Sequence, residues 1–377
     1  MIKLSKSVIG HGEKVAVGRV LDSEYLGMGR EVGKFEDELK EFFGRDVACV
    51  VNGTSALQLA LFAAGIKNGD EVLVQSLTYV ASFQSIAAVG AKAVACDVIQ
   101  DNLNIDLNDA ECRLTDKTKA IMPVHYAGHS QDLTSIYKFA DRHKLRVIED
   151  SAHCFGSTFD GKLVGSIGDI SCFSFDGIKN ITSGEGGCVV SDDPELMMKV
   201  REARLLGVVG DSAKRLKNDR SWNFDVTNLG WRFHMSDLMA AIGRVQLTRL
   251  PEFAKKRVRL AKRYCELLES VQSVGVIYTN YDTCVPHIFP ILVDPGIQIE
   301  QLRTDLLKRS IETGVHYTPN HRLSFFADRR ASKLRVTENI KGRLMSLPLH
   351  PDLTLSQIGF IVSNLSDCIR KQNDGIS

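Results

Sequence analysis

Short apolar runs alternate with helix-like segments through the first half of the chain. The helix-like segments begin near Thr54, Ala81 and Asp132, and the first of them, TSALQLALFAAG, opens on a hydroxyl residue and ends at Gly65. Apolar strands that are continuous and separated by helices are typical of a buried, largely parallel sheet. We therefore expect an α/β domain whose strands are Asp46–Val51, Glu71–Gln75, Ala93–Val98, Ala120–Val124, Leu145–Glu149, Ile170–Phe175 and Cys188–Ser191.

The pattern changes after about residue 235. The segment SDLMAAIGRVQLTRLPEFAKKRVRLAKRYCELLESV is long, charged and periodic like a helix, with an interruption at Pro251. The remainder of the chain holds a few strands, such as IFPILV, and two helical patterns, EQLRTDLLKRS and SQIGFIVSNLSDCI. We predict a large domain with an N-terminal arm over residues 1–250 and a smaller C-terminal α+β domain over residues 251–377.

Composition narrows the class of protein. The chain has 377 residues, of which 44% are hydrophobic and 25% charged, as is ordinary for a globular protein of two or three domain-sized units. Its net charge of +1 gives no global field that favours nucleic acid or an anionic membrane. No run of about 18 apolar residues occurs, so we expect no transmembrane helix. Nine scattered cysteines without a CxxC pair, and a start without an apolar signal core, predict a reduced, cytoplasmic protein.

One lysine stands among small residues in the stretch SFDGIKNITSGEGG, residues 174–187. Lys179 follows an apolar strand, where a loop can partly remove it from water. Loss of water lowers the pKa of a lysine, and the neutral amine then forms a Schiff base with an aldehyde. Taken alone, the motif also fits a solvated loop lysine, as most lysines are.

Three further stretches carry candidate groups, each with a plain structural alternative. In VNGTSAL a strand ends at a turn, and Thr54 and Ser55 open a helix whose free N–H groups attract phosphate, unless they only cap it. In VIEDSAHCFGS, Asp150 ends a buried strand and needs either a cation, such as a protonated pyridine nitrogen, or a set of backbone N–H donors. His153 could bind the same ligand. Tyr79, in SLTYVASF, could stack on a flat ring or be a core aromatic residue.

These stretches lie on loops after different strands, and parallel α/β sheets bind ligands at the carboxyl ends of their strands. A phosphate cradle, a stacking aromatic ring, a carboxylate for a ring nitrogen and a lysine for an aldehyde together describe one molecule, pyridoxal phosphate (PLP). The two histidines of HYAGH, residues 125–129, have the spacing of metal ligands on a helix, but Gly128 opposes a helix and no third ligand lies nearby. We predict a PLP cofactor and no metal.

Over nearly its whole length the sequence resembles the DegT/DnrJ/EryC1/StrS family of PLP-dependent sugar aminotransferases. The motifs that carry the resemblance are NGTSAL, TYVAS, PVHYAG, IEDSAH, SFDGIKNITSGEGG, WRFHMSDLMAAIGRVQL and LPLHPDL. The resemblance implies the aspartate aminotransferase fold, fold type I. In this fold a large PLP-binding domain with a mostly parallel seven-stranded sheet precedes a smaller C-terminal α+β domain. It also implies a homodimer whose active sites borrow residues from the partner chain.

The resemblance implies roles for individual residues. Lys179 would bond the cofactor and shuttle protons, and Asp150 would pair with the pyridinium nitrogen. His153 falls near the phenolic oxygen of the cofactor in the family pattern, and Tyr79 falls at the stacked aromatic residue. Together with Ser55, which the residue pattern suggests, the expected cofactor contacts are Gly53, Thr54, Ser55, Tyr79, Asp150, His153, Ser174, Lys179 and Arg232.

Two positions depart from the family pattern. The family usually reads something like GYNYRM before the long helix, and its asparagine reaches the partner's phosphate; here GWRFHM places Arg232 at that position. An arginine binds phosphate with a stronger charge but a different geometry. Asp176 stands where the family often has His or Tyr. It orients a sugar hydroxyl, tunes Lys179, or is simply a turn residue before Gly177.

The implied reaction is amino transfer to a nucleotide-linked keto sugar, at C3 or C4, with L-glutamate as donor and ping-pong kinetics. One alternative is a dehydratase or lyase on the same fold, which Lys179 opposes because family dehydratases that remove a 3-hydroxyl carry histidine there. Another is a non-catalytic PLP-binding regulator, although no DNA-reading module is seen. Candidate substrate residues, each of which could instead be plain surface, are Arg30 and Lys34 for the diphosphate and Asp176, His316, Tyr317 and His321 for the sugar.

Overall fold

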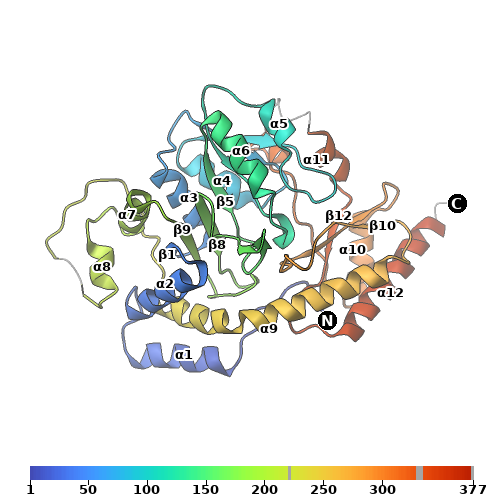
Figure 1. Ribbon diagram of the computed structural model, residues 1–377. Coiled ribbons are helices and arrows are strands. Elements are labelled where there is room, and N and C mark those ends of the chain that lie inside the picture. The colour runs from blue at the N-terminus through green and yellow to red at the C-terminus, as the bar shows by residue number, and fades with distance from the viewer. Residues whose placement is uncertain (220–221, 328–333, 375–377) are drawn as a thin grey trace.

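A seven-stranded sheet lies at the centre of the N-terminal part of the protein (Figure 1). The computed structural model describes residues 1–219, 222–327 and 334–374. Strand β9 is antiparallel to both of its neighbours and the other strands pair in parallel, which confirms the predicted mostly parallel sheet. In spatial order the strands are β1 (Asp46–Val50), β9 (Gly187–Ser191), β8 (Ile170–Ser174), β5 (Arg146–Asp150), β4 (Thr118–Met122), β2 (Glu71–Gln75) and β3 (Lys92–Cys96).

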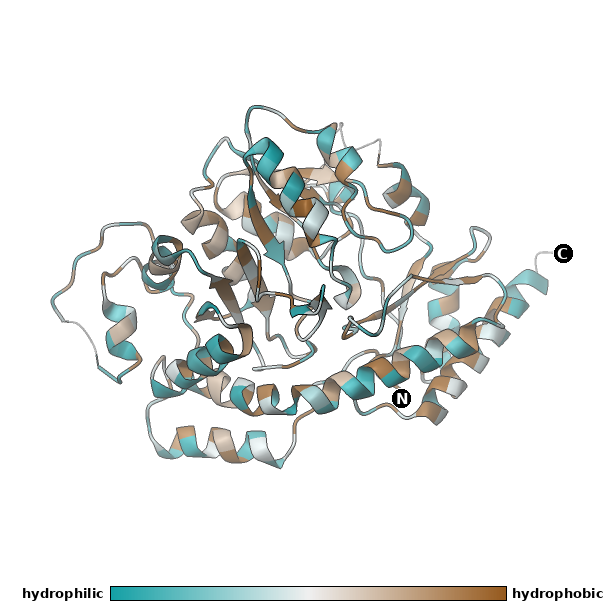
Figure 2. Cartoon of the chain, in the orientation of Figure 1, coloured by the Kyte–Doolittle hydropathy of each residue, from teal (hydrophilic) through white to brown (hydrophobic). Residues whose placement is uncertain are grey.

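Helices cover both faces of this sheet, because its strands are apolar on both faces. Val72 and Val74 of β2 pack into one core cluster, whereas Leu73 between them packs into another cluster with Ile136. Figure 2 shows mostly hydrophobic residues along the strands of the sheet, and both hydrophilic and hydrophobic residues along helices such as α6 and α9. The covering helices are α2 (Arg30–Phe43), α3 (Gly53–Ala63), α4 (Val80–Ala88), α5 (Leu107–Glu111), α6 (Leu133–His143) and α7 (Pro194–Ala203).

One long helix connects the sheet to the C-terminal part. Helix α9 (Asp237–Leu268) packs against α1 (His11–Asp22) and α2 and also contacts α12 (Leu355–Asp374). It continues through Pro251, so the interruption expected there is only an interior proline, which removes one N–H donor without ending the helix. The helix also crosses residues 250 and 251, where the predicted domains meet, and that boundary stays a prediction.

The C-terminal part is built on a three-stranded antiparallel sheet, which fits the expected α+β pattern. Ile291 of its central strand shares a core cluster with Leu302 and Ile361 of the helices that cover it. No helix in the described ranges is both long and apolar enough to cross a membrane. The remaining elements are β6 (Thr158–Phe159), β7 (Lys162–Leu163), α8 (Asp211–Arg215), β10 (Val274–Val276), β11 (Phe289–Val293), α10 (Ile299–Lys308), α11 (Arg335–Ile340), β12 (Leu344–Leu347) and the 3-10 turns η1 (Tyr126–Gly128) and η2 (Asn320–Arg322).

Candidate active site

The loops at the carboxyl ends of the parallel strands bring the predicted groups to one edge of the sheet. Asp150 is the last residue of β5, and Ser174 is the last residue of β8. Gly53 begins the helix after β1, Tyr79 lies just before α4, and Lys179 lies in the loop between β8 and β9. Strand ends and helix N-termini converge at such an edge, which is where parallel α/β sheets hold ligands.

Lys179 is half-buried, and its Nζ lies 3.4 Å from Nε2 of His287. Its N–H donates to the Asp176 carbonyl at 3.1 Å, which fixes the start of the side chain. Burial lowers the pKa of Lys179 to about 8, even though the carboxylates of Asp150 and Asp176 act in the opposite direction. The geometry therefore favours a reactive amine over a solvated loop lysine, because a neutral amine is the form that attacks an aldehyde.

We expect the apo protein to bind an aldehyde faster as the pH rises. Only the neutral amine attacks the carbonyl carbon, and a pKa of about 8 for Lys179 places the change between roughly pH 7 and 9. The rate should rise through this interval and level off above it. Stopped-flow absorbance after mixing apo protein with pyridoxal phosphate at each pH measures the rate. A rate that keeps rising to about pH 10, as for a solvated lysine, would contradict the expectation.

The carboxylate of Asp150 is 5% exposed and only partly satisfied. Its Oδ2 accepts a hydrogen bond from Ser82 Oγ at 2.7 Å, and its Oδ1 accepts one from the Ala152 N–H at 3.2 Å. No basic side chain in the described part of the chain forms an ion pair with it. A buried carboxylate whose oxygens contact no cationic group is costly, so the site favours a cationic ligand group over a purely structural role.

The turn after β1 approaches the end of β8 so closely that only glycine fits. A Cβ on Gly53 would lie 2.8 Å from Cβ of Ser174. The cap of α3 differs from the sequence-based expectation, because Asn52 rather than a hydroxyl residue caps this helix. Asn52 Oδ1 accepts hydrogen bonds from the N–H of Ser55 at 2.8 Å and from its hydroxyl at 2.9 Å, so Ser55 serves the cap. The helix N-terminus at Gly53 and Thr54 and the Ser174 hydroxyl form a surface of donors that suits a phosphate.

Replacing Gly53 with alanine should weaken cofactor binding. The new methyl group cannot lie 2.8 Å from Ser174, so the turn must shift, at a cost of about 1–3 kcal/mol. The affinity for pyridoxal phosphate should fall about tenfold to a hundredfold, as measured by equilibrium titration of the apo protein. Gly18→Ala is the control, because a Cβ on Gly18 meets nothing within 4 Å. Equal affinities in the two variants would argue against the phosphate cradle.

A histidine and two tyrosines from three different segments lie next to one another. His153 Nε2 is hydrogen-bonded to the hydroxyl of Tyr317 at 2.9 Å, and the ring centroid of Tyr317 lies 5.6 Å from that of Tyr79. Burial lowers the pKa of His153 well below its ordinary value, so its ring is neutral. Its buried Nδ1 has no hydrogen-bond partner among the described residues. Tyr79 is 56% exposed, which suits a stacking residue rather than a core aromatic residue.

Three of the candidate substrate residues lie elsewhere or are already engaged. His321 is buried and held at both ring nitrogens, by Ser76 Oγ and by Glu338 Oε1, each at 2.6 Å, so it is not plain surface, and its contact with the sugar stays a prediction. Arg30 and Lys34 line a groove of 610 Å³ between α1, α2 and α9, and this groove shares no lining residue with the lysine loop. Their assignment to the diphosphate stays a prediction.

Two other candidates lie near the lysine. His316 Nδ1 is hydrogen-bonded to Ser346 Oγ at 2.8 Å, and burial, followed by the charge of Lys179, lowers its pKa to about 4. Asp176 Oδ1 accepts a hydrogen bond from the Ile178 N–H at 3.2 Å, as a turn residue does. The same carboxylate also acts to raise the pKa of Lys179, while a contact of Asp176 with a sugar hydroxyl stays a prediction.

Arg232, in place of the family's asparagine, is exposed. Its backbone forms a β-bridge with Leu205. The neighbouring His234 has its pKa lowered to about 4 by burial and by the charges of Arg215 and Arg232. A role of Arg232 in binding phosphate, in this chain or in a partner, stays a prediction.

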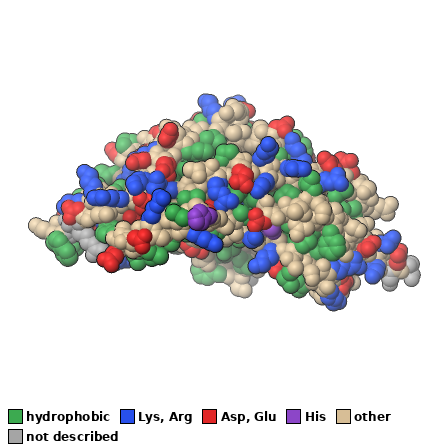
Figure 3. Space-filling view, turned by 90° about the horizontal axis from the view of Figure 1, so that it is seen from below, with side chains coloured by type: hydrophobic (Ala, Val, Ile, Leu, Met, Phe, Trp, Pro, Cys, Tyr) green, Lys and Arg blue, Asp and Glu red, His purple; other side chains and the backbone are tan. Residues whose placement is uncertain are grey.

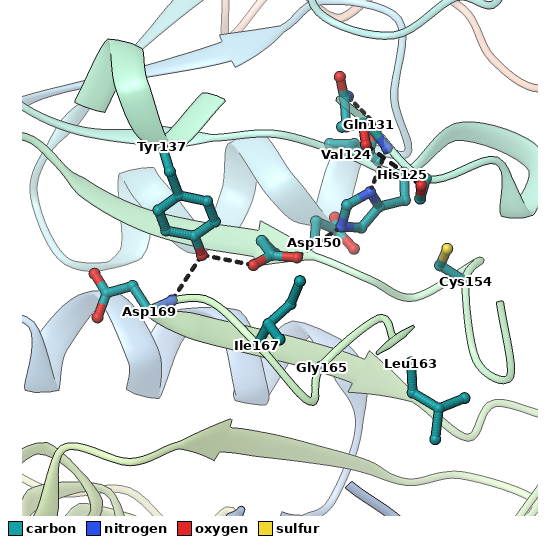
Figure 4. Close-up of polar contacts among 12 residues, drawn as sticks. Val124, His125, Gln131, Tyr137, Asp150, Cys154, Leu163, Gly165, Ile167 and Asp169 are labelled. Carbon is teal, nitrogen blue, oxygen red and sulfur yellow. Dashed lines mark hydrogen bonds and ion pairs between the residues drawn. The ribbon is translucent and has the colours of Figure 1, made fainter. Parts of the chain in front are cut away.

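The histidines of HYAGH are engaged within the protein. His125 is fully buried, and its Nδ1 accepts a hydrogen bond from the Gln131 N–H at 2.9 Å, so Nε2 carries the proton and donates it to Glu149 at 2.9 Å. Tyr137 donates to the same carboxylate at 2.7 Å (Figure 4). This network braces the strand that ends at Asp150. The described residues contain no group of three or more His, Cys, Asp or Glu that could hold a metal ion.

Two residues beside Lys179 were missed by the sequence reasoning. His287 lies two residues before β11, and Arg257 lies on α9, where it is 1% exposed. Both come from beyond the central sheet, so no local spacing connects them to the lysine motif. The signal that was available is weak: a histidine before an apolar strand, and an arginine on the buried face of a long helix.

The architecture is that of a type I PLP transferase, with a lysine and a carboxylate at the carboxyl edge of its sheet. The chain belongs to the DegT/DnrJ/EryC1/StrS aminotransferase family, whose model matches residues 8–366, so the predicted family is confirmed. It is 34% identical over 375 residues to the spore coat polysaccharide biosynthesis protein SpsC of Bacillus subtilis. The aligned region covers 97% of this chain and 96% of that protein.

Solved structures confirm the fold. The aminotransferase TlmJ from Streptoalloteichus hindustanus superposes with a TM-score of 0.91 at 30% identity, over 99% of this chain and 100% of that chain. A putative sugar aminotransferase from Streptococcus pneumoniae in its PLP form superposes with a TM-score of 0.91 at 26% identity, over 98% of this chain and 99% of that chain. Family and neighbours together imply pyridoxal phosphate as the cofactor.

Proposed function

We propose that this protein transfers an amino group from L-glutamate to a nucleotide-linked keto sugar, at C3 or C4, with pyridoxal phosphate as cofactor. The observation that carries the proposal is Lys179, a half-buried amine with a pKa of about 8 at the edge of the sheet where Asp150 also lies. Membership in an aminotransferase family supports the reaction class. A sugar acceptor is supported by the putative sugar aminotransferase of S. pneumoniae and by SpsC, a polysaccharide biosynthesis protein.

The residues at this edge fit pyridoxal phosphate. The donors around Gly53 suit its phosphate, and the partly satisfied carboxylate of Asp150 suits a protonated ring nitrogen. The exposed ring of Tyr79 offers a stacking face, and the unpartnered Nδ1 of His153 offers a further polar contact. When bound, the cofactor supplies an aldehyde carbon and an electron-withdrawing ring.

The side chains of the protein then divide the remaining work. Asp150 holds the proton on the ring nitrogen of the cofactor. Lys179 Nζ takes a proton from the α-carbon of the donor in the first half-reaction and delivers a proton to the amine-bearing carbon of the sugar in the second. Because both half-reactions use one site in turn, we expect ping-pong kinetics.

We also propose that the protein acts as a homodimer in the cytoplasm. The segment around α8, which projects from the body in Figure 1, carries the exposed side chains of Trp222, Phe224 and Leu229. Large apolar side chains gathered on one segment are typical of a surface that another chain covers.

The charges and cysteines bear on the other expected partners and on the compartment. On the face seen in Figure 3, acidic and basic side chains are interspersed, so this face gives no support to a role in binding nucleic acid. The nine free cysteines fit a reducing compartment.

A spectroscopic titration tests the function. Protein incubated with pyridoxal phosphate should show a visible absorption band. Adding L-glutamate should abolish this band and yield one equivalent of 2-oxoglutarate. A nucleotide-linked keto sugar should then restore the band and emerge as an amino sugar. A band that ignores glutamate would rule out the donor, and a sugar product without donor nitrogen would indicate the lyase. Folded protein that forms no band would overturn the proposal.

A further inference from the structure

A buried histidine from the C-terminal part stands beside the lysine amine. His287 follows Lys179 by 108 residues in the chain, and its Nε2 lies 3.4 Å from Nζ. Its side chain is 3% exposed, and its Nδ1 is buried without a hydrogen-bond partner in the described part of the chain. Within those described ranges, the lysine amine is therefore the one hydrogen-bonding group that meets this ring.

The backbone of His287 is held from two sides. Its N–H donates to the Ala127 carbonyl at 2.9 Å, and its carbonyl accepts a hydrogen bond from the Arg257 guanidinium at 3.1 Å. Arg257 also donates to the Pro286 carbonyl at 3.3 Å, and no carboxylate among the described residues pairs with it. Its Nη1 donates to the Leu349 carbonyl as well, at 3.4 Å, so this buried guanidinium connects α9 to the backbone before β11 and to the segment after β12.

The imidazole of His287 is neutral. Burial lowers its pKa well below the ordinary value, and its ring centroid lies 4.5 Å from that of His153. A neutral imidazole accepts a hydrogen bond at one nitrogen only, so accepting at Nε2 places the proton on Nδ1. The titratable and charged groups around the ring, which all lower its pKa further, are Lys179, His153, Arg257 and His316.

We propose that His287 is a positioning residue for Lys179. Its Nε2 accepts a hydrogen bond from Nζ and so directs the amine lone pair toward the donor's α-carbon, while Arg257 keeps the imidazole in place. This inference rests on the proposed function, because it assigns the proton transfers to Lys179. Fixing one N–H restricts the orientation of the amine before transfer, and a misplacement of about 1 Å can cost about a hundredfold in rate.

Labelling of Lys179 in the apo protein tests the contact without cofactor. The protein is treated with acetic anhydride across a pH series, and the peptide acetylated at Lys179 is quantified by mass spectrometry. In the wild type, labelling should reach half of its maximum at a pH of about 8. A hydrogen bond to Nε2 favours the charged amine, so His287→Phe should lower the midpoint by about one unit. His287→Gln supplies a carbonyl acceptor and should restore it. A midpoint unchanged in His287→Phe overturns the proposal.

A matched control and a measurement on the wild type complete the test. His350→Gln removes another buried histidine that lies in the field of Arg257, and it should leave the midpoint unchanged. If His287→Phe does not fold, nitrogen-15 NMR of histidine-labelled wild-type apo protein decides. We expect the Nδ1–H tautomer for the signal that disappears in His287→Gln. An Nε2–H tautomer could not accept from Lys179 and would overturn the proposal.

Turnover separates this proposal from the proposed function. In the active enzyme, His287→Phe should lower kcat about tenfold with little change in KM, and His287→Gln should recover most of the loss. An unchanged kcat in His287→Phe would contradict the positioning role. If the wild type forms no absorption band with pyridoxal phosphate, the proposed function fails, and the labelling and tautomer results still decide the contact of His287.

Discussion

Replacing Lys179 with alanine is expected to lower amino transfer by about 10⁴-fold. The same amine bonds the cofactor and moves a proton in both half-reactions, and burial lowers its pKa to about 8 so that the neutral base is available. The initial rate of 2-oxoglutarate release in the presence of a keto sugar measures the loss. Absorbance should show that the variant no longer bonds the cofactor covalently.

Two further variants make this expectation specific. Lys179→Arg keeps the positive charge, but a guanidinium stays protonated and cannot act as a base, so this variant should be as inactive as the alanine variant. Lys162→Ala removes an exposed lysine of β7 and should leave turnover unchanged. A Lys179 variant that keeps more than about a tenth of the wild-type rate would assign the proton transfers to another residue.

The sheet and its functional edge could be predicted because their signals are local. Every predicted strand overlaps an observed one: Glu71–Gln75 matches β2 at both ends, and the bounds of the others differ by at most two residues, as Ala120–Val124 does from β4. Parallel strands place their carboxyl ends at one edge, so residues that follow different strands had to meet there. The positions of Lys179, Asp150 and Tyr79 in the structure follow from this rule.

The contacts that sequence could not supply are those between distant segments. Ser55 looked like a free hydroxyl donor, but Asn52 competes for it as the helix cap. His321 looked like a pocket residue, but Ser76 and Glu338, from different parts of the chain, occupy both of its nitrogens. His287 meets the lysine only because the C-terminal part packs against the sheet edge, which no periodicity records.

Replacing Asp150 with asparagine should lower kcat by about 10²- to 10³-fold while leaving the protein folded. Asparagine has nearly the same shape and can keep the hydrogen bond with Ser82, but it carries no charge to hold a proton on the ring nitrogen of the cofactor. The cofactor should therefore still bind, as titration of its absorption band would show. The loss should fall on the step that removes the α-proton of glutamate, measured in single-turnover experiments with deuterated donor.

The neighbouring carboxylate provides the matched control for Asp150→Asn. Glu149 precedes Asp150 on β5, and because successive side chains of a strand point to opposite faces it lies in the buried network with His125 and Tyr137. Glu149→Gln should lower the free energy of unfolding by about 1–3 kcal/mol and leave kcat of the folded protein nearly unchanged. Two adjacent acids on one strand would then show opposite effects, one on turnover and one on stability. Equal losses of turnover in the two variants would mean that Asp150 acts by supporting the sheet edge rather than by holding the proton.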